Sequence, residues 1–196
     1  LEIFDMPRLE IPELSKSNKN RWGKCNTLTS AYGHGVSTTL LQLTRAYAAI
    51  VNGGVLLDSS ILFNSKLNKK RVISKETSAI MNQMLRANVD KKNKTSGSGR
   101  KADISGYDVL GKTGTAQKPS KKEKGYSKEI LNVFASAFPS KKPKYVLTVL
   151  IDEPKGAPQI WKHSRREAGW NAVYIAGKII QKIGPSLAIN DLDLLN

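Results

Sequence analysis

The sequence predicts one compact unit of the α/β (α+β) class, in which an antiparallel sheet is flanked by helices. Three strand-like segments follow one another within residues 106–152. The links between them favour hairpin connections over crossover helices, so neighbouring strands are expected to pair antiparallel. Apolar residues recur at helical spacing before and after these strands. At 196 residues the chain can bury one hydrophobic core.

Three helices are expected where an apolar stripe follows a residue that can cap a helix. They run from Thr38 or Ser37 to Val51, from Ser74 to about Asn88, and from Asn171 to Ile183. Gly184-Pro185 is expected to end the last helix. Residues 1–20 read as an irregular lead-in and residues 186–196 as a tail.

The three expected strands cover residues 106–117, 130–138 and 145–152. The third strand is apolar on both faces, which predicts a central strand covered by helices. The charged segment 118–129 is expected to be a long hairpin loop. The polar segment 89–105 is expected to be a mobile loop beside the first strand, and residues 55–62 a short extended piece.

Lys112-Thr113-Gly114-Thr115 fits two unrelated signatures. Residues 106–113 match the phosphate-loop pattern G-x-x-x-x-G-K-[ST], which requires a glycine-lined arc followed directly by a helix. The residues between the two glycines are mostly bulky and suit a strand, and the residues after Thr113 would start a helix badly. The residues therefore favour the other signature, the K-T-G element of penicillin-interacting serine enzymes, which lies on a strand.

Such a strand has the groups that bind an extended, peptide-like ligand. Thr113 and Thr115 share one face because side chains alternate along a strand. Gly114 lets a ligand backbone come close, and an edge strand has free backbone groups for pairing. Two hydroxyls and the nearby Lys112 ammonium suit a carboxylate.

Two longer motifs resemble class B penicillin-binding proteins, the monofunctional peptidoglycan transpeptidases. Residues 32–54 read YGHGVSTTLLQLTRAYAAIVNGG and resemble the helix that precedes the K-T-G strand in that family. Residues 111–117 read GKTGTAQ and match its K-T-G form. Arg21-Trp22-Gly23 and Gly169-Trp170-Asn171-Ala172 are also similar to the septal, cell-division branch.

The resemblance implies the serine β-lactamase-like transpeptidase fold, with residues 1–196 as the C-terminal part of one transpeptidase domain. It implies that Lys112 supplies positive potential and helps to orient the substrate. Thr113 and Thr115 would hold the terminal carboxylate of a D-alanyl-D-alanine stem, or of a penicillin that mimics it. The backbone N–H of Thr115 would be one oxyanion-hole donor. The reaction would pass through an acyl-enzyme, with no metal or organic cofactor.

The resemblance also implies partners and a location. The substrate would be peptidoglycan stem peptides on a lipid-linked precursor, the inhibitors β-lactams, and the protein partners membrane proteins of the division machinery. The parent protein would be anchored in the plasma membrane with this domain outside the cytoplasm. The chain itself contains no apolar run long enough to cross a bilayer.

The acylating half of the family's site is missing from these residues. No S-x-N motif occurs, and the one S-x-x-K match, Ser98 to Lys101, lies in a Gly/Ser-rich loop rather than at the start of a buried helix. We interpret that match as chance. Thr39 stands where the family has a helix-starting proline. The chain therefore reads as the C-terminal part of a longer enzyme, inactive alone.

Several alternatives stay open. An elongation-type transpeptidase and a non-catalytic remnant are compatible with the same motifs. A serine β-lactamase relative is not excluded directly, although the motif at residues 32–54 argues against it. The formal net charge of +16 is compatible with a polyanion-binding module. The lysines, however, fall in separate loops without interleaved aromatics, which disfavours nucleic acid. Cys25 is the only cysteine, and His34 and His163 have no ligand cluster around them, so a metal site is not expected.

Overall fold

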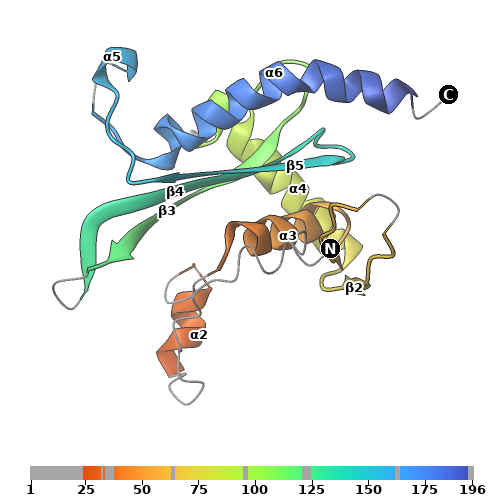
Figure 1. Ribbon diagram of the computed structural model, residues 1–196, viewed down its shortest axis with the longest axis horizontal. Helices are drawn as coiled ribbons and strands as arrows, with labels where there is room; N and C mark the ends of the chain where they lie inside the picture. Colours follow the sequence, from red (N-terminus) through yellow and green to blue (C-terminus); the bar gives the residue numbers. More distant parts are fainter. Residues whose placement is uncertain are drawn as a thin grey trace.

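The computed structural model describes residues 24–31, 33, 38–62, 65–94, 97–120, 125–161 and 164–193, and the statements below concern these residues. Within them a sheet of antiparallel strands has the order β3-β4-β5, flanked by helices (Figure 1). The expected fold class is confirmed. The strands are β1 (Val55–Leu57), β2 (Lys69–Arg71), β3 (Leu110–Pro119), β4 (Tyr126–Phe138) and β5 (Tyr145–Asp152). The helices are α2 (Lys24–Ser30), α3 (Leu40–Val51), α4 (Lys75–Val89), α5 (Pro158–Trp161), α6 (Ala172–Asp193) and the 3-10 turns η3 (Arg100–Ala102) and η4 (Ala168–Trp170).

The pairing register sorts the side chains of the sheet onto two faces. Residues paired across antiparallel strands point to the same face. Lys112 pairs with Ala135, whose side chain packs in the cluster with α3, so we call this side the α3 face. Thr113 pairs with Phe134, whose ring packs in the cluster with α6, so we call that side the α6 face. The two helices lie on opposite sides of the sheet in Figure 1.

Each face has its own hydrophobic core. On the α6 face, Phe134 is fully buried among side chains of α6 and the two 3-10 turns. On the α3 face, Leu110 is fully buried against α3 and α4. Burying a side chain of this size contributes about 1.5–3 kcal/mol. The two cores thus hold β3 and β4 in place from both sides.

The caps of α3 and α4 follow from the hydroxyl residues before them. Thr39 caps α3 in a capping box, because its Oγ1 accepts from Gln42 N–H and the Gln42 side chain accepts from Thr39 N–H. The cap is therefore Thr39 and not Thr38, whose hydroxyl donates to the Gln42 side chain instead. Ser74 caps α4 as expected, and α3 ends at Val51 as expected.

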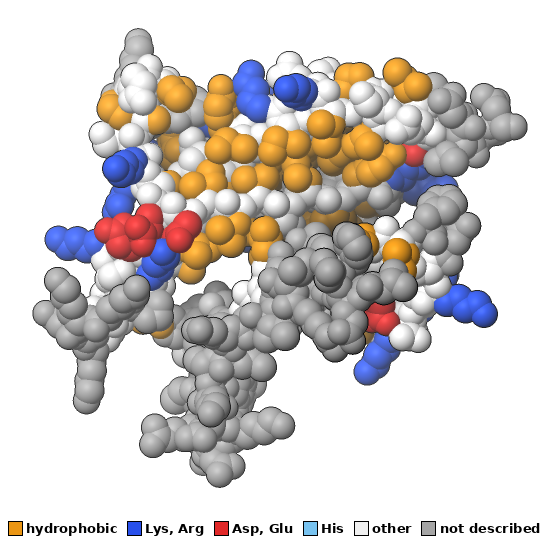
Figure 2. All heavy atoms as spheres, viewed as in Figure 1, with side chains coloured by type: hydrophobic (Ala, Val, Ile, Leu, Met, Phe, Trp, Pro, Cys, Tyr) orange, Lys and Arg blue, Asp and Glu red, His pale blue; other side chains and the backbone are white. Residues whose placement is uncertain are grey.

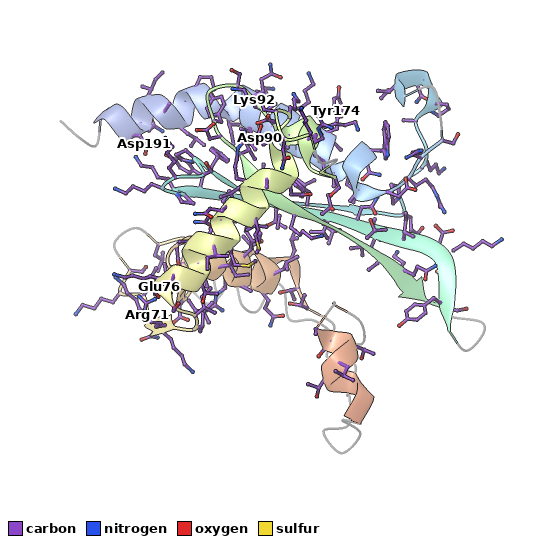
Figure 3. The ribbon with its side chains drawn as sticks, turned by 180° about the vertical axis from the view of Figure 1, so that it is seen from behind. Arg71, Glu76, Asp90, Lys92, Tyr174 and Asp191 are labelled. Carbon is purple, nitrogen blue, oxygen red and sulfur yellow. The ribbon has the colours of Figure 1, made fainter. Side chains whose placement is uncertain are left out.

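The last helix does not end at Gly184-Pro185. It continues to Asp193, so the tail predicted for residues 186–196 is helical as far as the structure describes it. Tertiary contacts offset the hydrogen bond that proline cannot donate. Leu187 packs against the α6-face core, and Asp191 accepts from the Tyr145 hydroxyl at 2.8 Å and pairs with Lys144 at 2.9 Å (Figure 3).

Two predictions about the strands need correction. The strand carrying Lys112 begins at Leu110 rather than residue 106, because Gly106 and Asp108 have positive φ angles of 88° and 45° and turn the chain. The strands also extend into the predicted loop 118–129, since β4 begins at Tyr126. The predicted loop 89–105 lies beside β3, but it contains η3 with Ala102 fully buried.

Among the described residues the third strand is not central, because β4 lies between β3 and β5. The apolar side chains of β5 reflect cover on its two faces, by α6 and by α3, rather than a central position. Within the described part of the chain, Leu131, Val133 and Leu150 share the α3 face; the first two are half-buried and Leu150 is 39% exposed. Hydrophobic side chains are visible on both sides of β5 in Figure 2.

The irregular lead-in predicted for residues 1–20 lies outside the described residues, as do His34 and His163 and the side chain of Cys25. Helix α2 and the strands β1 and β2 were not among the predicted elements, apart from the extended piece at residues 55–62. No helix in the described ranges combines the length and the apolarity needed to cross a bilayer.

Candidate functional site

Strand β3, which carries Lys112 to Thr115, lies at one edge of the described sheet. The residues form a continuous strand across Lys112 and Thr113, with no helix after them. This geometry does not fit a phosphate loop, which must open into a helix at these two residues. The strand interpretation of the motif is confirmed.

Side chains hold three alternate carbonyl groups along this edge. They are Val109 O, which accepts from Arg86 at 2.6 Å, Gly111 O, which accepts from Asn88 at 2.8 Å, and Thr113 O, which accepts from Lys112 at 2.8 Å. In an antiparallel pair the backbone groups of alternate residues point to the same edge of a strand. By this alternation the N–H of Thr115 also points away from β4, toward the open edge.

The two hydroxyls of the motif lie together on the α6 face, as the sequence predicts. Thr113 Oγ1 is 2.7 Å from Ser98 Oγ, and Thr115 Oγ1 accepts from the backbone N–H of Ala168 at 3.4 Å. Thr113 is half-buried and Thr115 is exposed. A ligand at the edge of β3 can therefore reach both hydroxyls.

Lys112 and Gly114 belong to the opposite, α3 face. Lys112 is exposed, and its Nζ bends back to the carbonyl of Thr113, which brings the ammonium to the edge of the strand. A Cβ atom added to Gly114 would meet only Val133 Cβ, at 4.0 Å, so the space beside Gly114 is open. The structure thus brings the ammonium, the two hydroxyls and an unobstructed stretch of backbone to one strand edge.

Helix α4 fixes the start of β3 through its last two turns. It crosses β3 on its way from Glu76 to Asp90 (Figure 3). Arg86 donates to Val109 O and also pairs with Asp103 at 2.8 Å. Burial alone would raise the pKa of Asp103, but hydrogen bonds from Lys91 N–H and Arg86 outweigh it and hold the pKa below its ordinary value.

A buried asparagine lies opposite Thr115 on the neighbouring strand. Asn132 pairs with Thr115 across the sheet and is fully buried. Its Nδ2 donates to the carbonyl of Arg166 and to Asn171 Oδ1, which ties β4 to the segment that carries Ala168. Sequence reasoning missed this residue. The signal was available, since a single asparagine interrupts the apolar run of β4.

Ser98 and Lys101, the one S-x-x-K match, do not have the expected geometry of a nucleophile and its base. Ser98 is exposed in a turn, and the helix after it, η3, has only three residues. Lys101 Nζ lies 3.6 Å from the ring centroid of Trp170. Burial, with a smaller contribution from Arg165, lowers the pKa of Lys101. Ser98 instead contacts Thr113, which the sequence did not predict.

Comparisons with known proteins agree on one family. The family model described as the penicillin-binding protein transpeptidase domain matches residues 4–180. The chain is 32% identical over 192 residues to the probable peptidoglycan D,D-transpeptidase FtsI of Caulobacter vibrioides, covering 93% of this chain and 32% of that protein. It is 34% identical over 182 residues to the stage V sporulation protein D of Bacillus subtilis, covering 86% of this chain and 26% of that protein.

Solved structures give the same result. The crystal structure of penicillin-binding protein 3 from Mycobacterium tuberculosis complexed with ampicillin superposes with a TM-score of 0.68 at 28% identity, covering 84% of this chain and 39% of that chain. The transpeptidase domain of Burkholderia pseudomallei penicillin-binding protein 3 gives a TM-score of 0.64 at 28% identity, covering 84% and 48%. The chain spans about a third or less of the length of the curated relatives above.

Proposed function

Because the chain belongs to the penicillin-binding protein transpeptidase domain family, we propose that its parent protein is a peptidoglycan D,D-transpeptidase that acts in septal cell-wall synthesis. The observation that carries the proposal is that β3 is an edge strand of the described sheet and that the hydroxyls of Thr113 and Thr115 lie together on one of its faces. The substrate is a stem peptide ending in D-alanyl-D-alanine on a lipid-linked precursor, and β-lactams are its mimics.

In this proposal each residue of the motif has a role, and Thr115 has two. Thr113 and Thr115 donate hydrogen bonds to the terminal carboxylate of the substrate, and the Lys112 ammonium adds positive potential beside it. Gly114 leaves room for the substrate backbone to pair with the strand edge. The Thr115 N–H donates to the oxyanion of the tetrahedral intermediate, a contact typically worth roughly 10²–10³ in rate.

The serine nucleophile lies outside these 196 residues in this proposal, since the sole S-x-x-K match does not open a buried helix. The serine attacks the carbonyl of the penultimate D-alanine, terminal D-alanine leaves, and the amine of a second stem accepts the acyl group. The parent protein is anchored in the plasma membrane beside division proteins, with this domain outside the cytoplasm. An elongation-type transpeptidase would share this chemistry and differ in its partners.

The test compares two substitutions of Thr115 in the polypeptide that the native gene encodes. Thr115→Val removes the hydroxyl at nearly constant size, and Thr115→Ser is the matched control that keeps it. We expect Thr115→Val to slow acylation by fluorescent penicillin by about tenfold or more, the size of a hydrogen bond to a charged group. Thr115→Ser should acylate at close to the wild-type rate. Equal rates for Thr115→Val and wild type would refute the role of the hydroxyl.

A β-lactamase and a non-catalytic remnant give different outcomes in the same assay. A β-lactamase would release the bound penicillin rapidly by hydrolysis, whereas a transpeptidase would keep the adduct. A remnant would form no adduct although it is folded. Either result with the wild-type protein would overturn the proposed transpeptidase function.

A further inference from the structure

A serine outside the K-T-G motif contacts the hydroxyl of Thr113. Ser98 Oγ lies 2.7 Å from Thr113 Oγ1, where either hydroxyl can donate, and it donates to Asn88 Oδ1 at 3.3 Å. The backbone N–H of Ser98 also donates to Asn88 Oδ1, at 3.1 Å. Asn88, Ser98 and Thr113 therefore form one chain of hydrogen bonds that leads from α4 to the edge of β3.

Asn88 determines which way the hydrogen bonds run at the α4 end of this series. Its Nδ2 donates to Gly111 O at 2.8 Å, so its Oδ1 must face Ser98. The Oδ1 atom can only accept, and the N–H of Ser98 already supplies one hydrogen bond to it. An amide oxygen can accept two hydrogen bonds, and the second one here, from the Ser98 hydroxyl, is the longer at 3.3 Å. The hydroxyl hydrogen of Ser98 can therefore turn from Asn88 to Thr113 Oγ1, which is nearer at 2.7 Å.

The direction of the Ser98 hydrogen decides what Thr113 presents at the strand edge. A hydroxyl has one hydrogen and can accept two. If Ser98 donates to Asn88, Thr113 gives its hydrogen to Ser98 and presents lone pairs, which repel a carboxylate. If Ser98 donates to Thr113, the hydrogen of Thr113 is released and can be donated to a carboxylate. The second arrangement also strengthens the Thr113 donor, because consecutive hydrogen bonds polarise one another.

We propose that Ser98, held by Asn88, is a positioning residue that orients the Thr113 hydroxyl for recognition of the substrate carboxylate. This inference rests on the proposed transpeptidase function. Ser98 forms no covalent bond with the substrate and is not the nucleophile. It acts by donating its hydrogen to Thr113 Oγ1 when an anionic ligand occupies the edge of β3.

The test measures acylation rate constants of the native gene product with benzylpenicillin and with its methyl ester, which lacks the carboxylate charge. Ser98→Ala removes the donor to Thr113, and Ser98→Thr keeps it. Ser105→Ala is the matched control, since Ser105 is exposed in the turn before β3. Ser98→Cys, which donates weakly at a similar size, replaces Ser98→Ala if thermal unfolding shows that the alanine variant is not folded.

We expect Ser98→Ala to slow acylation by benzylpenicillin by roughly fivefold or more, the size of one hydrogen bond. The ester should lose little, Ser98→Thr should restore the rate, and Ser105→Ala should match wild type. Unchanged rates in Ser98→Ala, or an equal loss with penicillin and ester, would overturn the positioning role while leaving the proposed function intact. A folded wild type that neither compound acylates would overturn the proposed function, and this inference with it.

Discussion

The two glycines of the G-K-T-G stretch have different physical roles, and alanine substitutions separate them. A Cβ added to Gly111 would lie 2.4 Å from Phe134 Cζ and 2.7 Å from Phe134 Cε2. The ring is fully buried and cannot swing away. A Cβ added to Gly114 would meet only Val133, at 4.0 Å. Neither glycine has a positive φ, so alanine is compatible with both backbones.

The magnitudes follow from these distances. Gly111→Ala overpacks the α6-face core and should cost about 1–3 kcal/mol of unfolding free energy. For a unit of this size each kcal/mol shifts the unfolding temperature by about 2–4 °C. Gly114→Ala should change stability by less than about 0.5 kcal/mol, as a substitution in open space does. In the proposed function, however, its methyl group obstructs the substrate backbone and slows acylation.

Both glycine variants are made in the polypeptide that the native gene encodes. Differential scanning fluorimetry compares their unfolding temperatures with that of the wild type, and penicillin acylation compares their reaction rates. The account predicts a lower unfolding temperature for Gly111→Ala alone. It predicts slower acylation without destabilisation for Gly114→Ala. Equal unfolding temperatures for Gly111→Ala and wild type would refute the packing described between β3 and Phe134. Wild-type acylation by Gly114→Ala would refute the approach of a ligand along that stretch of the edge.

Three further predictions concern the scaffold. Tyr47→Phe should raise unfolding free energy by about 1 kcal/mol in chemical denaturation, because the Tyr47 hydroxyl is buried with no partner among the described residues, and a loss would contradict this. The pKa of Asp103 is lowered in the fold, so its contribution to stability is present above about pH 4 and is lost as pH falls toward the folded-state pKa. Asp103→Asn should therefore weaken the dependence of the unfolding temperature on acidic pH. An unchanged dependence would count against the ion pair with Arg86. Asp191→Ala should speed amide hydrogen exchange after Pro185 only, because Asp191 anchors the end of α6 to Tyr145, and unchanged exchange there would refute that anchor.

The sequence was a good guide where local physics decides the structure. Ser74 caps α4 because its hydroxyl satisfies a free N–H of the first turn, and that preference can be recognised in a sequence. The alternation of side chains placed Thr113 and Thr115 on one face of a strand. The third strand was predicted at its observed bounds, Tyr145–Asp152, because a run of β-branched and apolar residues ends at turn residues on both sides.

The errors arise where tertiary contacts override local preference. Gly184-Pro185 is a strong stop signal, yet Leu187 and Asp191 are held by residues far away in sequence and keep α6 helical. A strand with apolar side chains on both faces need not be central, because cover on two faces leaves its lateral position undetermined. Periodicity does not specify which strand is at the edge.

The polar residues around the site were also beyond sequence reasoning. Asn88, Ser98 and Asn132 come from α4, a loop and β4, and only the fold brings them to β3. Local patterns describe neighbours along one element, whereas these contacts span separations of 10 to 39 residues. The K-T-G residues could be found from the sequence, but the hydrogen bonds that orient them could not.

A crystal structure of the native gene product acylated by benzylpenicillin tests the central claim most directly, namely that the open edge of β3 binds the ligand. The account predicts the penicillin carboxylate within hydrogen-bonding distance of the Thr113 and Thr115 hydroxyls. The acyl carbonyl oxygen should accept from the Thr115 N–H. A bound penicillin whose carboxylate lies away from both hydroxyls, or whose carbonyl contacts other donors only, would contradict the account.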